Sequence, residues 1–365
     1  MAPSILGEYS KPVFLGILVA AVLFLISSYA FSMLSGLATF FFTEGGTSVG
    51  LIPLRRLPIW LLYLPIEIPI QVNIGVVFLS IWVIFAVCFV AAWQLREELH
   101  NVLKNALSHP TKKLFSNCLF ALPVVASMTL VAVIGIQSIQ ETGGIPTGQP
   151  SLPEDPFQAF FQLSYAALVE EIGFRISPIG AFLVVYLLVV GRRQLATCSM
   201  VQRLKLSVLA LLIPDRAKKR LTGVRSVGDF GVIGGISVGE WIMIILTATI
   251  FGLAHYIYGG GWQIGKITSA AAVGVALALT YLLYGVQAPV LLHWFFNYYF
   301  TSFELAWDLC PKVFSAYLVV WSVTIIVGIG GWVAFAILAI QKIAYSMEGR
   351  NHFQEGECLT EPHDY

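Results

Sequence analysis

The chain has 365 residues, of which 58% are hydrophobic and only 11% are charged, and its formal net charge is +1. Soluble domains carry about 25% charged residues, so this shortage indicates that lipid is the main solvent. A net charge so close to zero gives no bulk attraction for nucleic acid or for acidic partners, and we expect neither.

Apolar segments long enough to cross a bilayer recur along the whole chain. A spanning helix needs about 20 mostly apolar residues. The first segment is too long for a signal-peptide core of roughly 7–15 residues, so we expect it to be retained as a membrane helix. The predicted fold class is all-α, a polytopic bundle of about eight transmembrane helices. The eight segments are 12–42, 74–93, 119–137, 157–190, 240–258, 264–285, 288–307 and 313–341.

The segment 43–73 is apolar but dense in proline, which excludes a regular helix. We expect it to lie along the outer membrane interface, with Trp60 and Tyr63 at the level of the lipid headgroups. Its prolines are Pro53, Pro58, Pro65 and Pro69.

Lysine and arginine in the connecting loops set the expected orientation, since cytoplasmic loops carry an excess of these residues. Loop 94–118 contains four of them and loop 191–229 contains nine, whereas loop 138–156 has none and carries three acidic residues. We therefore predict a multi-pass protein of the cell membrane with both termini in the cytoplasm. Arg55 and Arg56, on the opposite side, do not fit this pattern.

The second basic loop and the cysteines carry two further signals. The sequence RLKLSVLALLIP in the second basic loop fits either a helix on the cytoplasmic surface or a solvated loop. The cysteines form no CxxC pair, which argues against a disulfide framework or a zinc ribbon, and we expect small buried residues or unreactive thiols. They are Cys88, Cys118, Cys198, Cys310 and Cys358.

The sequence LVEEIGFR, which begins at Leu168, places three ionisable residues inside the fourth apolar segment. Carboxylates at membrane depth are costly unless they face a partner or a cavity. Glu171 and Arg175 are four residues apart, so they share a helix face in the order that favours an ion pair. Glu170 points about 100° away from Glu171. It must find a partner on another helix or hold water, which is the setting of a general base.

Two of the six histidines lie in apolar segments. His255 is near the end of the fifth segment, and His293 is in the seventh, where Asn297 follows on the same helix face. Each of them alone fits a hydrogen bond between helices, and Phe251 fits simple packing. Together with the glutamates and the arginine, these residues are too polar a set for helix packing alone, and we expect one functional site.

Peptide hydrolysis needs a base that activates water, a proton for the leaving amine and donors for the oxyanion. Glu170 and His255 suit the first two tasks, and His293 and Asn297 suit the third. This chemistry requires no nucleophilic serine or cysteine, no cofactor and no metal ion.

Two alternatives stay open beside this hypothesis. Zinc metalloproteases use two histidines and a carboxylate, but the chain has no HExxH motif, and an arginine one turn away would oppose a cation. A transporter or binding scaffold could use the polar core as an ion or substrate site, although the sequence shows no internal duplication.

Three short motifs occur in order, each in an apolar segment: EEIGFR fits EExxxR, FGLAH fits FxxxH and HWFFN fits HxxxN. As a set they resemble the CAAX protease and bacteriocin-processing family, which are intramembrane glutamic endopeptidases related to the eukaryotic Ras-converting CAAX endoprotease. The resemblance covers about 157–307 and implies an eight-helix bundle with an intramembrane catalytic cavity open to lipid and cytosol. It implies catalytic roles for Glu170, His255, His293 and Asn297, with Glu171 and Arg175 in support.

The resemblance also implies partners and a division of the chain. The substrate would be a peptide or lipidated protein that enters from the membrane or the cytosol, and the eukaryotic relatives cut the last three residues from a prenylated cysteine. Membrane lipids are the other expected partner, and the sequence carries no signal for an oligomeric state. The predicted parts are N-terminal membrane helices (1–156), a catalytic membrane core (157–307), a last membrane helix (308–345) and a polar tail (346–365).

One expectation conflicts with a common site. The predicted spans place His255 near the outer end of its helix and His293 near the inner end of its own. The sequence YGGGWQ after His255 offers a solution, because glycine permits a deep, bent loop that lines a water-filled cavity.

Overall fold

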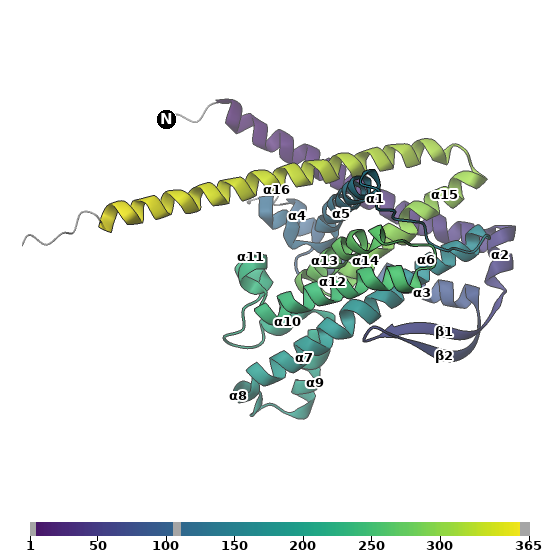
Figure 1. The fold of residues 1–365 in the computed structure, drawn as a ribbon, viewed down its shortest axis with the longest axis horizontal. Helices are drawn as coiled ribbons and strands as arrows, with labels where there is room; N and C mark the ends of the chain where they lie inside the picture. The colour runs from purple at the N-terminus through teal and green to yellow at the C-terminus, as the bar shows by residue number, and fades with distance from the viewer. Residues whose placement is uncertain (1–4, 105–110, 358–365) are drawn as a thin grey trace, which may run out of the picture.

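The computed structural model describes residues 5–104 and 111–357, most of them helical (Figure 1). Cys358 and the end of the predicted tail lie outside the described residues. The elements are α1 (Ile5–Phe42), α2 (Glu44–Gly50), β1 (Pro53–Leu61), β2 (Leu64–Asn73), α3 (Ile74–Gln94), α4 (Leu99–Lys104), the 3-10 turn η1 (Thr111–Ser116), α5 (Cys118–Thr142), α6 (Pro156–Glu171), the π turn η2 (Ile172–Ile176), α7 (Pro178–Val190), α8 (Arg192–Leu195), α9 (Met200–Leu212), α10 (Pro214–Lys218), α11 (Val227–Gly235), α12 (Val238–Tyr258), α13 (Gly265–Tyr284), α14 (Gln287–Trp294), the π turn η3 (Phe295–Tyr299), α15 (Phe300–Leu309) and α16 (Val313–Glu357).

Within the described residues, seven helical segments are long and apolar enough to cross a membrane, and they match the first six predicted spans and the last. The protein is therefore an integral, multi-pass membrane protein. The remaining predicted span, 288–307, lies in the consecutive helical elements α14, η3 and α15, which are not among these seven segments. The predicted all-α class is confirmed, with the hairpin β1–β2 as an addition.

The helices form a bundle in which α5 packs between α16 and α13, and α13 also packs against α12 and α14. Small residues permit the closest approaches. A Cβ added to Gly252 on α12 would lie 2.3 Å from the carbonyl oxygen of Ile267 on α13. On the other side of the bundle, the Ser32 and Ser302 hydroxyls join α1 to α15 at 2.6 Å. This packing surrounds the ends of α6 and α14, where the motif residues lie.

The loops at the two ends of the bundle form separate clusters. At one end, both basic loops meet the turn between α13 and α14. The Tyr284 hydroxyl donates to the Phe115 carbonyl at 2.6 Å, and the Val286 N–H donates to the Leu212 carbonyl at 2.9 Å. We call this the basic end.

At the other end, the loop between α5 and α6 meets the loop between α12 and α13. The Gln149 N–H donates to the Gly261 carbonyl at 3.3 Å, and the Gln263 N–H donates to the Thr147 carbonyl at 2.8 Å. We call this the cavity end, because the same two loops contribute walls to the cavity described below.

The proline-rich segment is not a helix, as predicted, but it forms a regular antiparallel hairpin that was not anticipated. Proline has no N–H, so Pro58 on β1 and Pro65 on β2 occupy ladder positions where no donor is needed. The turn residues Leu62 and Tyr63 have φ values of 48° and 68°. Positive φ at both central residues is what a two-residue type I′ turn requires.

The second basic loop folds into the short helices α8 to α11, so RLKLSVLALLIP is largely helical, and its place on the cytoplasmic surface stays a prediction. Leu206 and Ala210 of α9 are buried, and α9 packs against α7. A buried ion pair ties α10 to the start of α12, because Lys218 Nζ lies 2.9 Å from both carboxylate oxygens of Glu240.

Candidate active site

Glu171, Arg175 and His293 form a buried cluster where α6, η2 and α14 meet. Arg175 Nη1 donates a 2.9 Å hydrogen bond to Glu171 Oε1, and both side chains are fully buried, so the pair predicted from the spacing is present. His293 Nδ1 lies 2.8 Å from the same oxygen. An ionised carboxylate can only accept hydrogen bonds, so Nδ1 carries a proton and Nε2 is the nitrogen that remains for Glu170.

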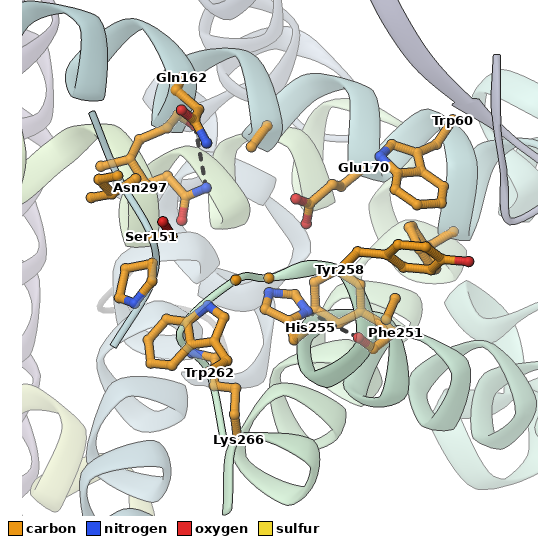
Figure 2. A pocket seen from close by; sticks show the side chains of 18 residues that line it. Trp60, Ser151, Gln162, Glu170, Phe251, His255, Tyr258, Trp262, Lys266 and Asn297 are labelled. Atoms are coloured by element: carbon orange, nitrogen blue, oxygen red, sulfur yellow. Dashed lines mark hydrogen bonds between the residues drawn. The ribbon is translucent and has the colours of Figure 1, made fainter. Parts of the chain in front are cut away.

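Glu170 faces a cavity rather than Arg175 (Figure 2). Its Oε2 lies 3.7 Å from His293 Nε2 and makes no hydrogen bond with any described residue. The side chain is 22% exposed, whereas that of Glu171 has no exposed surface. The two adjacent glutamates therefore differ in environment: Glu171 is fixed in an ion pair, whereas Glu170 lines the cavity and keeps one oxygen without a hydrogen-bond partner.

His255 lines the same cavity from α12. Its Nδ1 lies 2.9 Å from the Phe251 carbonyl oxygen. A carbonyl only accepts, so Nδ1 is protonated in the neutral ring, and Nε2 is the nitrogen that can accept a proton. Figure 2 shows the His255 ring on the opposite side of the cavity from the Glu170 carboxylate.

The Phe251 ring connects the parts of the site. Its centroid lies 4.5 Å from that of His255 and 5.9 Å from that of His293, edge-on to both. The guanidinium carbon of Arg175 lies 3.9 Å from the same centroid, within cation–π range. The histidines therefore lie at one level, and the separation implied by the predicted spans is wrong. His255 leans back one turn along α12 to reach the Phe251 carbonyl.

Asn297 lines the cavity from the π turn η3. Its Nδ2 donates one hydrogen bond to the Leu163 carbonyl at 3.2 Å, which leaves the second N–H for a ligand. The sequence suggested that His293 and Asn297 share a helix face. A π turn contains more residues than an α turn, so residues four apart across η3 do not point in the same direction. As a result, His293 lies behind Glu170 while Asn297 reaches the cavity.

The cavity has a volume of about 370 Å³, within the usual range for ligand sites. The glycine-rich loop after His255 lines it, as expected, and polar walls come from Gln162 and Lys266. Its aromatic walls are Trp60, Phe174, Phe251, Tyr258 and Trp262.

The hairpin contributes Trp60 to this cavity, which the sequence did not reveal. The Tyr63 N–H donates to the Gly173 carbonyl at 3.3 Å, and a Cβ added to Gly173 would lie 2.1 Å from the Trp60 Cβ. The rings of Trp60 and Tyr63 both pack on the ring of Phe174, with centroid distances of 5.5 Å and 5.8 Å respectively. The sequence did not predict this contact with the π turn that follows the glutamates, and the level of both residues in the membrane stays a prediction.

Lys266 is the other cavity residue that sequence reasoning missed. A lone basic residue at the start of an apolar helix was the available signal. Within residues 5–104 and 111–357, no group of three or more histidine, cysteine, aspartate or glutamate side chains is arranged to hold a metal ion.

A family model described as "Type II CAAX prenyl endopeptidase Rce1-like" matches residues 153–299. The matched segment contains all six polar motif residues, while the hairpin lies outside it. No curated protein and no solved structure matches the chain significantly. The part of the chain that carries the candidate site, residues 153–299, is thus similar to a family of CAAX prenyl endopeptidases, and it lies within a bundle of helices that can cross a membrane.

Proposed function

We propose that this protein is a metal-independent endopeptidase that hydrolyses a peptide bond with a water activated by Glu170. One observation carries this proposal. Glu170 lines the cavity that His255 lines from the opposite side, and its buried Oε2, which has no hydrogen-bond partner among the described residues, lies 3.7 Å from His293 Nε2. Glu170 as the base and His255 as a second proton acceptor can thus act on one bound water.

The reaction follows from these positions. Glu170, assisted by His255, takes a proton from water while the water oxygen attacks the scissile carbonyl carbon. Asn297, which lines the cavity, donates a hydrogen bond to the oxyanion, and His293 Nε2, which lies behind Glu170, orients the Glu170 carboxylate. The proton then passes to the leaving nitrogen, the C–N bond breaks, and the Glu170 carboxylate is restored. A positioned donor to an oxyanion contributes roughly 10²–10³ in rate.

Glu171 and Arg175 act as positioning residues in this proposal. Arg175 neutralises Glu171, and Glu171 fixes the tautomer of His293 through its Nδ1. A hydrogen bond of this kind sets which ring nitrogen faces the reaction. Glu171 and Arg175 therefore set the orientation of the His293 ring toward Glu170, and neither of them contacts the substrate.

The substrate is proposed from the family and the cavity together. The matched family is named for prenylated CAAX proteins, whose lipid-modified cysteine lies near the C-terminus. The aromatic walls of the cavity suit an apolar peptide segment. We also propose that the divisions suggested from the sequence hold, with 157–307 as the catalytic core.

The test is cleavage of a farnesylated CAAX-type peptide by the full-length protein in liposomes. Glu170→Gln keeps the shape of the side chain but removes a group that accepts a proton at neutral pH. We expect kcat to fall at least about 10²-fold. Glu304→Gln, at an exposed glutamate of α15 outside the cavity, is the matched control and keeps wild-type activity.

Wild-type cleavage by Glu170→Gln would show that another group is the base. A metal chelator separates the zinc alternative, because the proposed reaction continues in its presence. Activity that a chelator removes and added zinc restores would identify a metalloprotease instead.

A further inference from the structure

Lys266 is a basic residue in the wall of the cavity, and no carboxylate of a described residue lies within salt-bridge distance of it. It lies at the start of α13, and its Nζ is 3.8 Å from the centre of the Trp262 ring. Among the described residues, it makes neither a hydrogen bond nor a salt bridge. By contrast, Lys218, which is buried at the basic end, contacts both carboxylate oxygens of Glu240.

An ammonium group in a largely apolar wall is costly unless it is paired. The Trp262 face offsets part of this cost through a cation–π contact. The remaining N–H donors are available for an anion that enters the cavity. Glu170 and Lys266 reach the cavity from opposite walls, with His255 and Trp262 between them (Figure 2).

We propose that Lys266 binds the C-terminal carboxylate of the substrate peptide. This inference rests on the proposed function. A CAAX motif ends the chain, so every such substrate carries a carboxylate a few residues after the lipidated cysteine, whatever its side chains are. A lysine provides a point charge suited to this group.

A fixed carboxylate site makes Lys266 a specificity-determining residue. An extended peptide advances roughly 3.4 Å per residue, so anchoring the chain end at Lys266 sets which peptide bond lies next to Glu170. The site would thus select substrates by their distance from the C-terminus. It also explains why a cation is present in a cavity whose other walls are mostly aromatic or neutral.

The experiment compares one farnesylated CAAX-type peptide as its free acid and as its C-terminal amide. The amide keeps the scissile bond but lacks the negative charge. We expect the wild type to cleave the acid with a kcat/KM at least about tenfold higher, because charge-assisted hydrogen bonds are the strong ones. Lys266→Met should remove this preference by raising KM for the acid alone, and Lys266→Arg should retain part of it.

Lys312→Met, at an exposed lysine in the turn before α16, is the matched control and keeps the preference. Equal cleavage of acid and amide by the wild type would overturn the proposal. Equal slowing of the cleavage of acid and amide by Lys266→Met would also contradict the proposal, because Lys266 would then act on Glu170 and not on the substrate.

A binding measurement separates this inference from the proposed function. Trileucine and its amide are titrated into the detergent-solubilised full-length protein by calorimetry. Tighter binding of the acid by the wild type, lost in Lys266→Met, supports the carboxylate site even if no peptide is cleaved. Equal binding of acid and amide contradicts the site even if cleavage by Glu170 is established.

Discussion

At the residue scale, the site depends on two adjacent glutamates with different surroundings. Consecutive helix positions diverge by about 100°, so Glu171 turns into the bundle while Glu170 turns toward the cavity. Arg175 neutralises the first, whose side chain has no exposed surface, and the second keeps an unpaired oxygen. One dipeptide thereby supplies both an anchor for His293 and a candidate base.

The first prediction at this scale concerns Arg175→Met. Removing one partner of a buried ion pair leaves an uncompensated charge, which typically costs 3–5 kcal/mol. We expect a lower thermal unfolding midpoint in detergent and a loss of activity, since His293 loses its fixed partner. Arg192→Met, at an exposed arginine of α8, is the control and keeps the wild-type midpoint. An unchanged midpoint for Arg175→Met would show that Glu171 does not need its cation.

At the scale of elements, two π turns and a hairpin shape the cavity. The turn η2 follows the glutamates directly, and η3 carries Asn297. Such turns inside α-helices are frequent at functional sites because they re-aim side chains. The hairpin rests on η2 at Gly173, the position where the absence of a Cβ lets Trp60 approach. An element outside the matched family segment thus forms a wall of the candidate catalytic cavity.

The prediction at this scale tests that contact. Trp60→Ala removes a wall, and we expect a higher KM with an unchanged unfolding midpoint. Gly173→Ala should act the same way, because the added methyl group displaces Trp60. The double variant should then be no worse than the stronger single one, since coupled sites are non-additive. Gly135→Ala, where a Cβ meets nothing within 4 Å, is the control. Fully additive losses would mean that Gly173 acts independently of Trp60.

At the scale of the whole molecule, the cavity end lies opposite the basic end. The basic loops gather at the turn before α14, whereas the α5–α6 and α12–α13 loops contain no basic residue. Arg55 and Arg56 of the hairpin are the exceptions at the cavity end. With both termini in the cytoplasm, as we propose, the cavity end faces the other side of the membrane. The substrate then enters from that side or from the lipid, and the cytosolic entry implied by the resemblance does not fit this orientation.

Native cysteines allow a direct test of the orientation. Cys310 is exposed in the turn after α15, whereas Cys198 lies between α8 and α9 in the second basic loop. We expect a membrane-impermeant maleimide to label intact cells at Cys310, so Cys310→Ser abolishes the signal and Cys198→Ser does not. Labelling that depends on Cys198 instead would place the basic loops outside and the cavity end in the cytosol.

Much of the fold was predictable because lipid imposes a simple rule: a crossing needs an apolar helix of sufficient length. The spans followed from this rule, and the Glu171–Arg175 pair followed from helix periodicity, since both depend on neighbours close along the chain. The hairpin escaped prediction because Pro58 and Pro65 excluded a helix without indicating which strands would pair.

The sequence by itself determined that this is a bundle of membrane helices with a small set of polar residues inside it, because hydropathy and spacing are local properties. Only the tertiary structure decided which of those residues share a cavity. Phe251 joins both histidines and Arg175, Trp60 and Lys266 line the walls, and His293 lies behind Glu170. These contacts join helices that are distant along the chain, and their geometry depends on π turns and close glycine contacts that no local pattern encodes.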